Sequence, residues 1–178
     1  MTAKSSRRLV IDASVARASG GPDAVSPTSK HCSDFLQTAL VVCHQIVLTT
    51  EILEEWHRHE SKFASRWLAS MFARKNAKLI GSAEDRVLRR KISRSTQSEK
   101  ARAAMLKDVH LLEAALAADE IVVALDEIVR ELFAKASTSV GEIKAIVWVN
   151  PDKADEESLR WLENGAKADK KRTLWEKK

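Results

Sequence analysis

The sequence is poor in cysteine, glycine and proline, and it has no long hydrophobic run. Two cysteines in 178 residues are too few for a disulfide framework and fit a reducing compartment. With 5 Gly and 3 Pro, collagen-like and low-complexity chains are excluded. The longest apolar runs, such as 121–125 and 145–149, are far shorter than the roughly 20 residues of a membrane helix. The first run, 9–11, stops at Asp12, so we expect no signal peptide and a cytoplasmic protein with no membrane contact.

The charge of the chain is small in total but unevenly distributed. Hydrophobic residues make up 44% and charged residues 31%, as in an ordinary globular domain. The formal net charge is +5, and basic residues concentrate in segments 86–107 and 166–178, which leaves the rest of the chain acidic. An acidic body with basic segments suits a phosphodiester partner. For any single basic run, a solvated helix face is the simpler explanation.

Short apolar segments of strand type alternate with longer segments of helical periodicity. This alternation predicts a three-layer α/β/α fold with a central parallel sheet of four to five strands and a C-terminal helical extension. Strands are expected at residues 9–12, 45–50, 77–80, 120–126 and 144–150. Helices are expected at residues 29–43, 51–75, 82–94, 98–119, 127–136 and 152–164, with Ser82 capping the third of them.

Acidic residues stand where such a sheet would bind a ligand. Asp12 and Asp126 follow two predicted strands, and ligands of open parallel sheets bind beyond the carboxyl ends of the strands. Asp108 falls in the middle of the apolar stripe of its predicted helix, where an ionised carboxylate is costly unless it is paired or bound to a metal. A structural ion pair would explain Asp108 alone, but it would not explain why all three acids point to one rim.

Three glutamates, Glu51, Glu54 and Glu55, begin the helix after the second predicted strand. Acids in a first helical turn favour the helix dipole, and helical geometry does not choose among the three for a site. Carboxylates gathered at one rim repel each other unless a hard cation lies between them, and Mg²⁺ and Mn²⁺ prefer oxygen ligands. The sequence therefore predicts an Mg²⁺ or Mn²⁺ site suited to phosphodiester hydrolysis.

Four short segments resemble the PIN domain, the nuclease fold of VapC-like toxins and of many RNA-processing enzymes. They are Leu-Val-Ile-Asp-Ala-Ser-Val at 9–15, Leu-Thr-Thr-Glu-Ile-Leu-Glu-Glu-Trp at 48–56, Asp-Val-His-Leu-Leu-Glu-Ala-Ala at 108–115 and Ile-Val-Val-Ala-Leu-Asp at 121–126. The resemblance implies a metal-dependent endoribonuclease that cuts RNA, usually single-stranded. The resemblance is also compatible with three further properties: the role of toxin in a toxin–antitoxin pair, binding to an antitoxin-like protein, and a homodimer.

The resemblance also implies roles for individual residues. The acids that hold the metal and carry catalysis are Asp12, Glu55, Asp108 and Asp126. Supporting positions are Ser14 and Glu127, and Glu51 and Glu54 remain alternatives to Glu55. The predicted contacts to RNA are the basic residues Arg86, Arg89, Arg90, Lys91 and Arg94. Residues 1–150 form the expected nuclease domain with a basic helical segment at about 82–107, and residues 151–178 form a C-terminal helix and basic tail.

The chain also departs from the PIN pattern. Ala124 stands where the family often has Ser or Thr, two residues before the last aspartate, and the segment between Lys75 and Lys107 is long and basic. An alternative is therefore a catalytically degenerate PIN-like domain that binds RNA or a protein. A phosphotransfer receiver also places acids on a sheet rim, but receivers usually pair their acids soon after the first strand, and Asp12 stands alone.

Overall fold

The computed structural model describes residues 6–175, which form one five-stranded sheet with helices on both faces. The strands lie in the order β3-β2-β1-β4-β5, and every pairing within the sheet is parallel. Their bounds are β1 Arg8–Ile11, β2 Gln45–Thr49, β3 Ala77–Gly81, β4 Ile121–Val123 and β5 Val147–Val149. The predicted three-layer α/β/α fold with a parallel sheet is confirmed.

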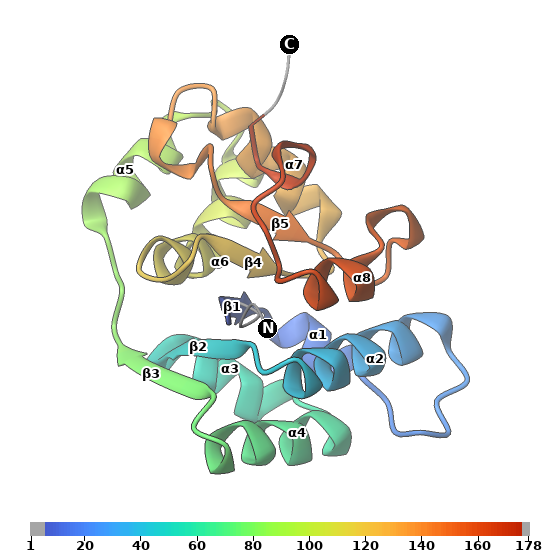
Figure 1. Cartoon of the computed structure of the whole chain (residues 1–178). Helices are drawn as coiled ribbons and strands as arrows, with labels where there is room; N and C mark the ends of the chain where they lie inside the picture. The colour runs from blue at the N-terminus through green and yellow to red at the C-terminus, as the bar shows by residue number, and fades with distance from the viewer. Residues whose placement is uncertain (1–5, 176–178) are drawn as a thin grey trace.

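Eight α-helices flank the sheet in the described part of the chain (Figure 1). They are α1 Ala13–Ala18, α2 Pro27–Val41, α3 Thr50–His59, α4 Lys62–Ala73, α5 Arg86–Arg94, α6 Glu99–Leu116, α7 Glu127–Ala136 and α8 Ser158–Glu163. Helices α1, α2 and α8 lie on one side of the sheet, and α5 and α6 lie on the other (Figure 1). Three short 3-10 helices cover Gly141–Ile143, Ala154–Glu156 and Lys170–Arg172.

Local side-chain chemistry fixes where most of these helices begin. In six α-helices the side chain of the N-cap residue accepts a hydrogen bond from a backbone N–H of the first turn, which contributes about 1 kcal/mol per helix. These N-caps are Asp12, Thr49, Ser61, Asp85, Ser98 and Asp126. Two of the predicted site acids, Asp12 and Asp126, therefore also have a structural role.

The core is formed by the apolar strands and by buried aromatic side chains, among them Trp56 and Trp67, whose N–H groups donate to backbone carbonyls. Trp56 is fully buried, and its Nε1 donates to the carbonyl oxygen of Ile11 at 2.8 Å. Trp67 of α4 donates to the carbonyl oxygen of Leu36 in α2 at 2.6 Å, and the rings of Trp56 and Trp67 stack with centroids 5.7 Å apart. These bonds tie α3 to the end of β1 and α4 to α2, so they fix the helices beside the carboxyl end of β1.

Three predicted helices differ from the structure. The helix predicted over 51–75 is two helices, because Glu60 is extended and Ser61 caps α4 by accepting from the backbone N–H of Ala64. Ser82 does not cap a helix. Asp85 is the N-cap of α5, and its Oδ1 accepts from two backbone N–H groups. The helix predicted over 152–164 is interrupted by Glu157, whose left-handed backbone (φ 42°) separates a 3-10 turn from α8.

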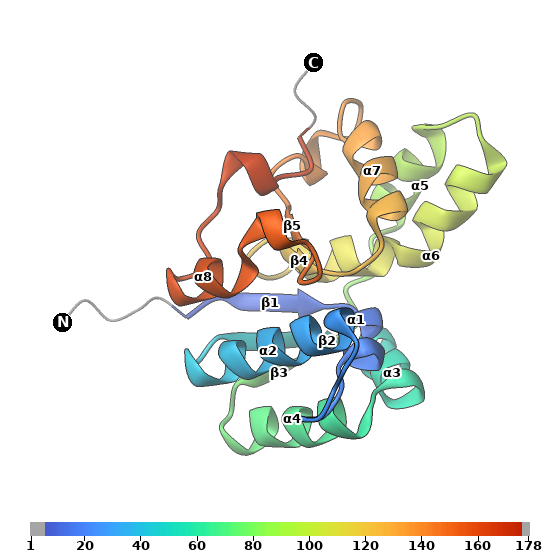
Figure 2. The same ribbon diagram turned by 90° about the vertical axis from the view of Figure 1, so that its right-hand side faces the viewer.

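Residues 170–174 pack back onto the free side of β5, whereas α8 packs against α2. Thr173 forms an antiparallel bridge with Val147, and the backbone N–H of Leu174 donates to the carbonyl oxygen of Ile146 at 2.9 Å. The side chain of Arg172, 5% exposed, lies over the ring of Trp161 at 5.6 Å from the guanidinium carbon to the ring centroid. Figure 2 shows α8 beside α2. Between residues 6 and 175, no helix has the length and apolar character needed to cross a membrane.

Candidate functional site

The chain adds its strands first on one side of β1 and then on the other, and this change of side at β1 defines a binding position. The chain runs from β1 to β2 and β3 on one side, and then places β4 on the other side of β1. Ligands of open α/β sheets bind at such a switch point, outside the carboxyl ends of the strands. Asp12 follows β1, Asp126 lies three residues after β4, and the backbone N–H of Asp12 donates to the carbonyl oxygen of Val123 at 2.9 Å. The two aspartates therefore flank the switch point.

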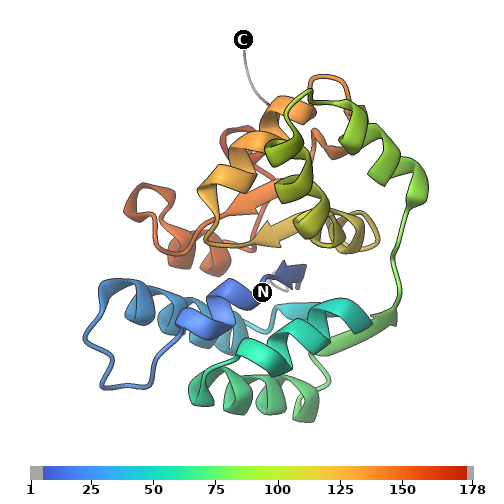
Figure 3. The same cartoon turned by 180° about the vertical axis from the view of Figure 1, so that it is seen from behind.

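A pocket of about 320 Å³ opens at this position, and we call it the acid pocket. Figure 3, which views the molecule from behind, shows α1, α3, α6 and α7 toward the viewer, around the ends of the central strands. The four predicted acids come from four separate segments, and all of them line the pocket. Its lining residues are Asp12, Ala13, Ser14, Arg17, Glu55, His59, Lys107, Asp108 and Asp126.

Asp12 and Asp126 are held in place by the helices that they cap. Oδ2 of Asp12 accepts from the backbone N–H of Ser14 at 3.1 Å, and Oδ1 of Asp126 accepts from the backbone N–H of Val129 at 2.9 Å. Within the described residues, the second oxygen of each carboxylate accepts no hydrogen bond. Each side chain is thus oriented through one oxygen, while the other can bind a ligand.

Asp108 contributes the most perturbed carboxyl group of the pocket. It is half-buried in the middle of α6, and no donor among residues 6–175 hydrogen-bonds to its carboxylate. Burial, and after it the negative charge of Asp12, raise the pKa of Asp108 to about 6. Asp126 acts in the same direction, whereas His110 and Lys107 oppose the shift. A cation in the pocket would relieve this repulsion.

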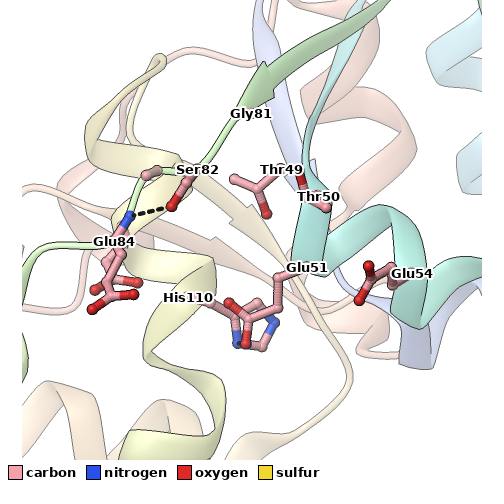
Figure 4. Close-up of a pocket in the computed structure, with 10 residues that line it drawn as sticks. Thr49, Thr50, Glu51, Glu54, Gly81, Ser82, Glu84 and His110 are labelled. Carbon is pink, nitrogen blue, oxygen red and sulfur yellow. Dashed lines mark hydrogen bonds and ion pairs between the residues drawn. The ribbon is translucent and has the colours of Figure 1, made fainter.

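The three glutamates at the start of α3 are divided between two pockets. Glu55 lines the acid pocket, whereas Glu51 and Glu54 line a neighbouring pocket of about 210 Å³ beyond the ends of β2 and β3. Figure 4 shows this second pocket, with the carboxylate of Glu51 beside the ring of His110 and Glu54 farther along α3. Of the three alternatives, the structure brings Glu55 together with the aspartates.

The two supporting positions have different environments. The Oγ of Ser14 accepts from the backbone N–H of Leu125 at 3.4 Å, so it links the turn after β1 to the turn after β4. Glu127 does not line the acid pocket, because its carboxylate is held by Asn150, Arg130 and Lys153. Although burial opposes it, the hydrogen bond from Asn150 and the two cations hold the pKa of Glu127 below its ordinary value.

The basic residues of α5 lie away from the acid pocket, and three of the five predicted RNA contacts are paired with acids. Arg89 makes a bidentate pair with the buried Glu113 (Nε to Oε1 2.7 Å and Nη2 to Oε2 2.8 Å). Arg86 pairs with Glu84 at 3.4 Å, and Lys91 pairs with Glu142. The remaining two, Arg90 and Arg94, have no ion pair within the described part of the chain.

The cations that do line the acid pocket are Arg17 and Lys107, together with His59. None of the three was predicted as a site residue: Arg17 and His59 lie outside the basic segments, and Lys107 is the last residue of segment 86–107. The available signal was positional: Arg17 follows Ser14 by one helical turn, and Lys107 immediately precedes Asp108. Across residues 6–175, neither Arg17 nor Lys107 forms an ion pair with an acid, so their charges remain free for an anionic ligand.

The donor set of the pocket suits a hard cation, but the coordination is not preassembled. Among residues 6–175, there is no group of three or more His, Cys, Asp and Glu side chains that could hold a metal ion. Magnesium usually keeps several waters and binds through one or two carboxylates, so it does not require such a group. The oxygen-only acids and the unpartnered carboxylate of Asp108 therefore fit Mg²⁺ or Mn²⁺, with water completing the shell.

Comparisons with known proteins do not assign the chain to a family. It matches no protein-family model, no curated protein and no solved structure. Its function therefore has to be inferred from the residues of the acid pocket.

Proposed function

We propose that the chain is a metal-dependent endoribonuclease that hydrolyses RNA phosphodiester bonds in the acid pocket. The observation that carries the proposal is the convergence of Asp12, Glu55, Asp108 and Asp126 on one pocket at the switch point of the sheet. These acids are as many as 114 positions apart in the sequence, and helix capping accounts for the positions of Asp12 and Asp126 only. RNA as the substrate rests on the resemblance to PIN domains.

The acids of the pocket would hold Mg²⁺ or Mn²⁺ through their carboxylate oxygens. When bound, such an ion polarises a phosphoryl oxygen and lowers the pKa of a bound water molecule. The caps of α1 and α7 orient Asp12 and Asp126 in advance, so these side chains need little rearrangement to bind. Asp108 would lose its repulsive environment on binding, which gives the pocket a preference for a cation over water.

Arg17 and Lys107 would attract the phosphate backbone of RNA. Phosphate contacts by Lys and Arg supply most of the sequence-independent affinity for nucleic acids. Both side chains line the same pocket as the acids, so they would place a phosphodiester beside the carboxylates. We therefore assign the first contacts with the substrate to these two residues and not to the paired cations of α5.

Cleavage of single-stranded RNA by the purified protein tests the proposal. We expect cleavage with Mn²⁺ or Mg²⁺ and none with EDTA, and we expect Asp12→Asn and Asp108→Asn each to abolish it. Asp23→Asn, which changes an exposed acid in the loop between α1 and α2, is the matched control and should cleave as the wild type does. If several RNAs stay intact at high protein concentration with either ion, the proposed activity is wrong.

A second function is favoured by two observations. The described residues contain no preassembled metal group, and Ala124 lacks the hydroxyl that PIN domains often place before the last aspartate. A PIN-like domain without activity would bind RNA or a protein partner instead. Titration with Mn²⁺ separates the two functions, because an active pocket binds the ion and loses it in Asp126→Asn, whereas a degenerate pocket binds none.

The resemblance to VapC-like toxins, and with it an antitoxin-like partner and a homodimer, remains a prediction. Induced expression in a bacterial host tests the toxin role. A toxin should arrest growth, and Asp12→Asn should remove the arrest. Growth at the normal rate with active ribonuclease present would place the enzyme outside this class.

A further inference from the structure

His110 is a buried histidine between the two pockets. It lies on α6 two residues after Asp108, and only 3% of its surface is exposed. It lines the pocket of Glu51 and Glu54, yet it also contacts Glu55 of the acid pocket. A buried imidazole needs partners for its ring nitrogens, because an unsatisfied polar group in the interior is costly.

Both ring nitrogens of His110 face oxygen atoms that accept hydrogen bonds. Nδ1 is 3.0 Å from the carbonyl oxygen of Lys107. Nε2 is 3.2 Å from Oε2 of Glu55. An ionised Glu55 carboxylate only accepts, so the N–H on Nε2 donates to it. The ring then bridges the backbone of α6 and a carboxylate of α3.

We propose that His110 is a positioning residue that holds the Glu55 carboxylate at the acid pocket. This inference rests on the proposed function, since it assigns Glu55 to the metal site. The same turn of α6 then carries Asp108, which lines the pocket, and His110, which orients Glu55 of α3. The contact explains why Glu55 is the glutamate that serves the pocket, while Glu51 lies 3.8 Å from Nδ1 on the other side of the ring (Figure 4).

The physical benefit of this contact is preorganisation. A glutamate side chain has several rotatable bonds, and an unrestrained carboxylate loses their freedom when it binds a metal. A charge-assisted hydrogen bond to the carboxylate from a ring that is itself buried removes much of this loss in advance. Partners that orient metal-binding side chains typically change metal affinity by about 10–100-fold when they are removed.

Three variants of the full chain test the proposal, and the affinity for Mn²⁺ measured by isothermal titration calorimetry is the readout. His110→Leu removes the N–H donor to Glu55 at similar volume, whereas His110→Gln keeps an N–H near the position of Nε2. We expect His110→Leu to weaken Mn²⁺ binding by about 10–100-fold and His110→Gln to restore most of it. His57→Gln, which changes an exposed histidine of α3, is the matched control and should bind as the wild type does.

Glu55→Gln and the double variant Glu55→Gln, His110→Leu complete the cycle. If His110 acts through Glu55, the double variant binds Mn²⁺ no more weakly than Glu55→Gln does. Additive losses, or wild-type affinity in His110→Leu, would overturn the inference while leaving the ribonuclease proposal intact. If the wild type itself binds no Mn²⁺, the proposed function fails and the inference fails with it.

A second measurement leaves His110 in place, so it does not depend on the folding of a histidine variant. The ¹⁵N signal of His110 Nε2 is compared between the wild type and Glu55→Gln without metal. We expect it to shift, because the charge-assisted hydrogen bond is lost. An unchanged signal would show that the ring does not hold Glu55.

Discussion

Replacing Asp108 by asparagine should stabilise the metal-free protein at neutral pH. The folded pKa of Asp108 is about 6 against an ordinary value of 3.8, chiefly because burial disfavours the charged carboxylate. Between these two values the folded state binds more protons than the unfolded state, so stability falls as the pH rises through this window. Above pH 6 the full destabilisation by ionised Asp108 is present, and below about pH 4 it is absent.

The size of the effect follows from the same shift. At 1.36 kcal/mol per pKa unit, the difference between 3.8 and about 6 corresponds to at most about 3 kcal/mol. Because the carboxyl group is only half-buried, solvent screens part of this, and we expect about 1–1.5 kcal/mol. In a protein of 178 residues this raises the melting temperature by about 2–6 °C.

Thermal unfolding in EDTA at pH 8 and at pH 4 measures this effect. Asp108→Asn should melt above the wild type at pH 8 and close to it at pH 4. Excess Mn²⁺ should raise the melting temperature of the wild type and leave that of Asp108→Asn nearly unchanged. A lower melting temperature of metal-free Asp108→Asn at pH 8 would refute the reasoning, because Asp108 would then be a structural partner and not a strained acid.

Three further predictions concern other parts of the molecule. Arg17→Ala and Lys107→Ala should each raise the KM for RNA at moderate salt and make RNA binding depend less steeply on salt concentration. If the salt dependence of RNA binding is unchanged, these residues do not contact the phosphates of the substrate. Arg89→Met should destabilise the fold by about 3–5 kcal/mol in denaturant unfolding, because it leaves the Glu113 carboxylate buried without its cation; a loss below about 1 kcal/mol would contradict this. Ser61→Ala should cost about 1 kcal/mol through the lost cap of α4, and unchanged stability would show that packing alone fixes the break between α3 and α4.

The fold could be predicted from local patterns, because they agree with the tertiary structure. The apolar runs at β1, β2 and β4 indicate buried parallel strands, and α7 spans the predicted 127–136 because Asp126 caps it. The break at Ser61 could not be seen, since the apolar periodicity continues on both sides of it. The break there is also tied to a distant backbone group, the carbonyl oxygen of Ala16, which accepts from the backbone N–H of Ser61.

The site was predictable for the aspartates and much less so for the residues around them. Asp12 and Asp126 follow strands, and Asp108 interrupts an apolar stripe, so a local sequence pattern marks each of them as a candidate site residue. No such pattern marks Glu55, because only its contact with α6 distinguishes it from Glu51 and Glu54. His110 points away from Asp108 on the helix, and its role depends on α3, which local periodicity cannot place beside α6.

The proposed function requires that the carboxylates of the acid pocket share a divalent cation. A crystal soaked in Mn²⁺, with data collected for anomalous scattering, tests it directly. We expect an anomalous peak in the acid pocket, within bonding distance of carboxylate oxygens of at least two among Asp12, Glu55, Asp108 and Asp126. Well-ordered side chains at these four positions with no peak between them would contradict the account.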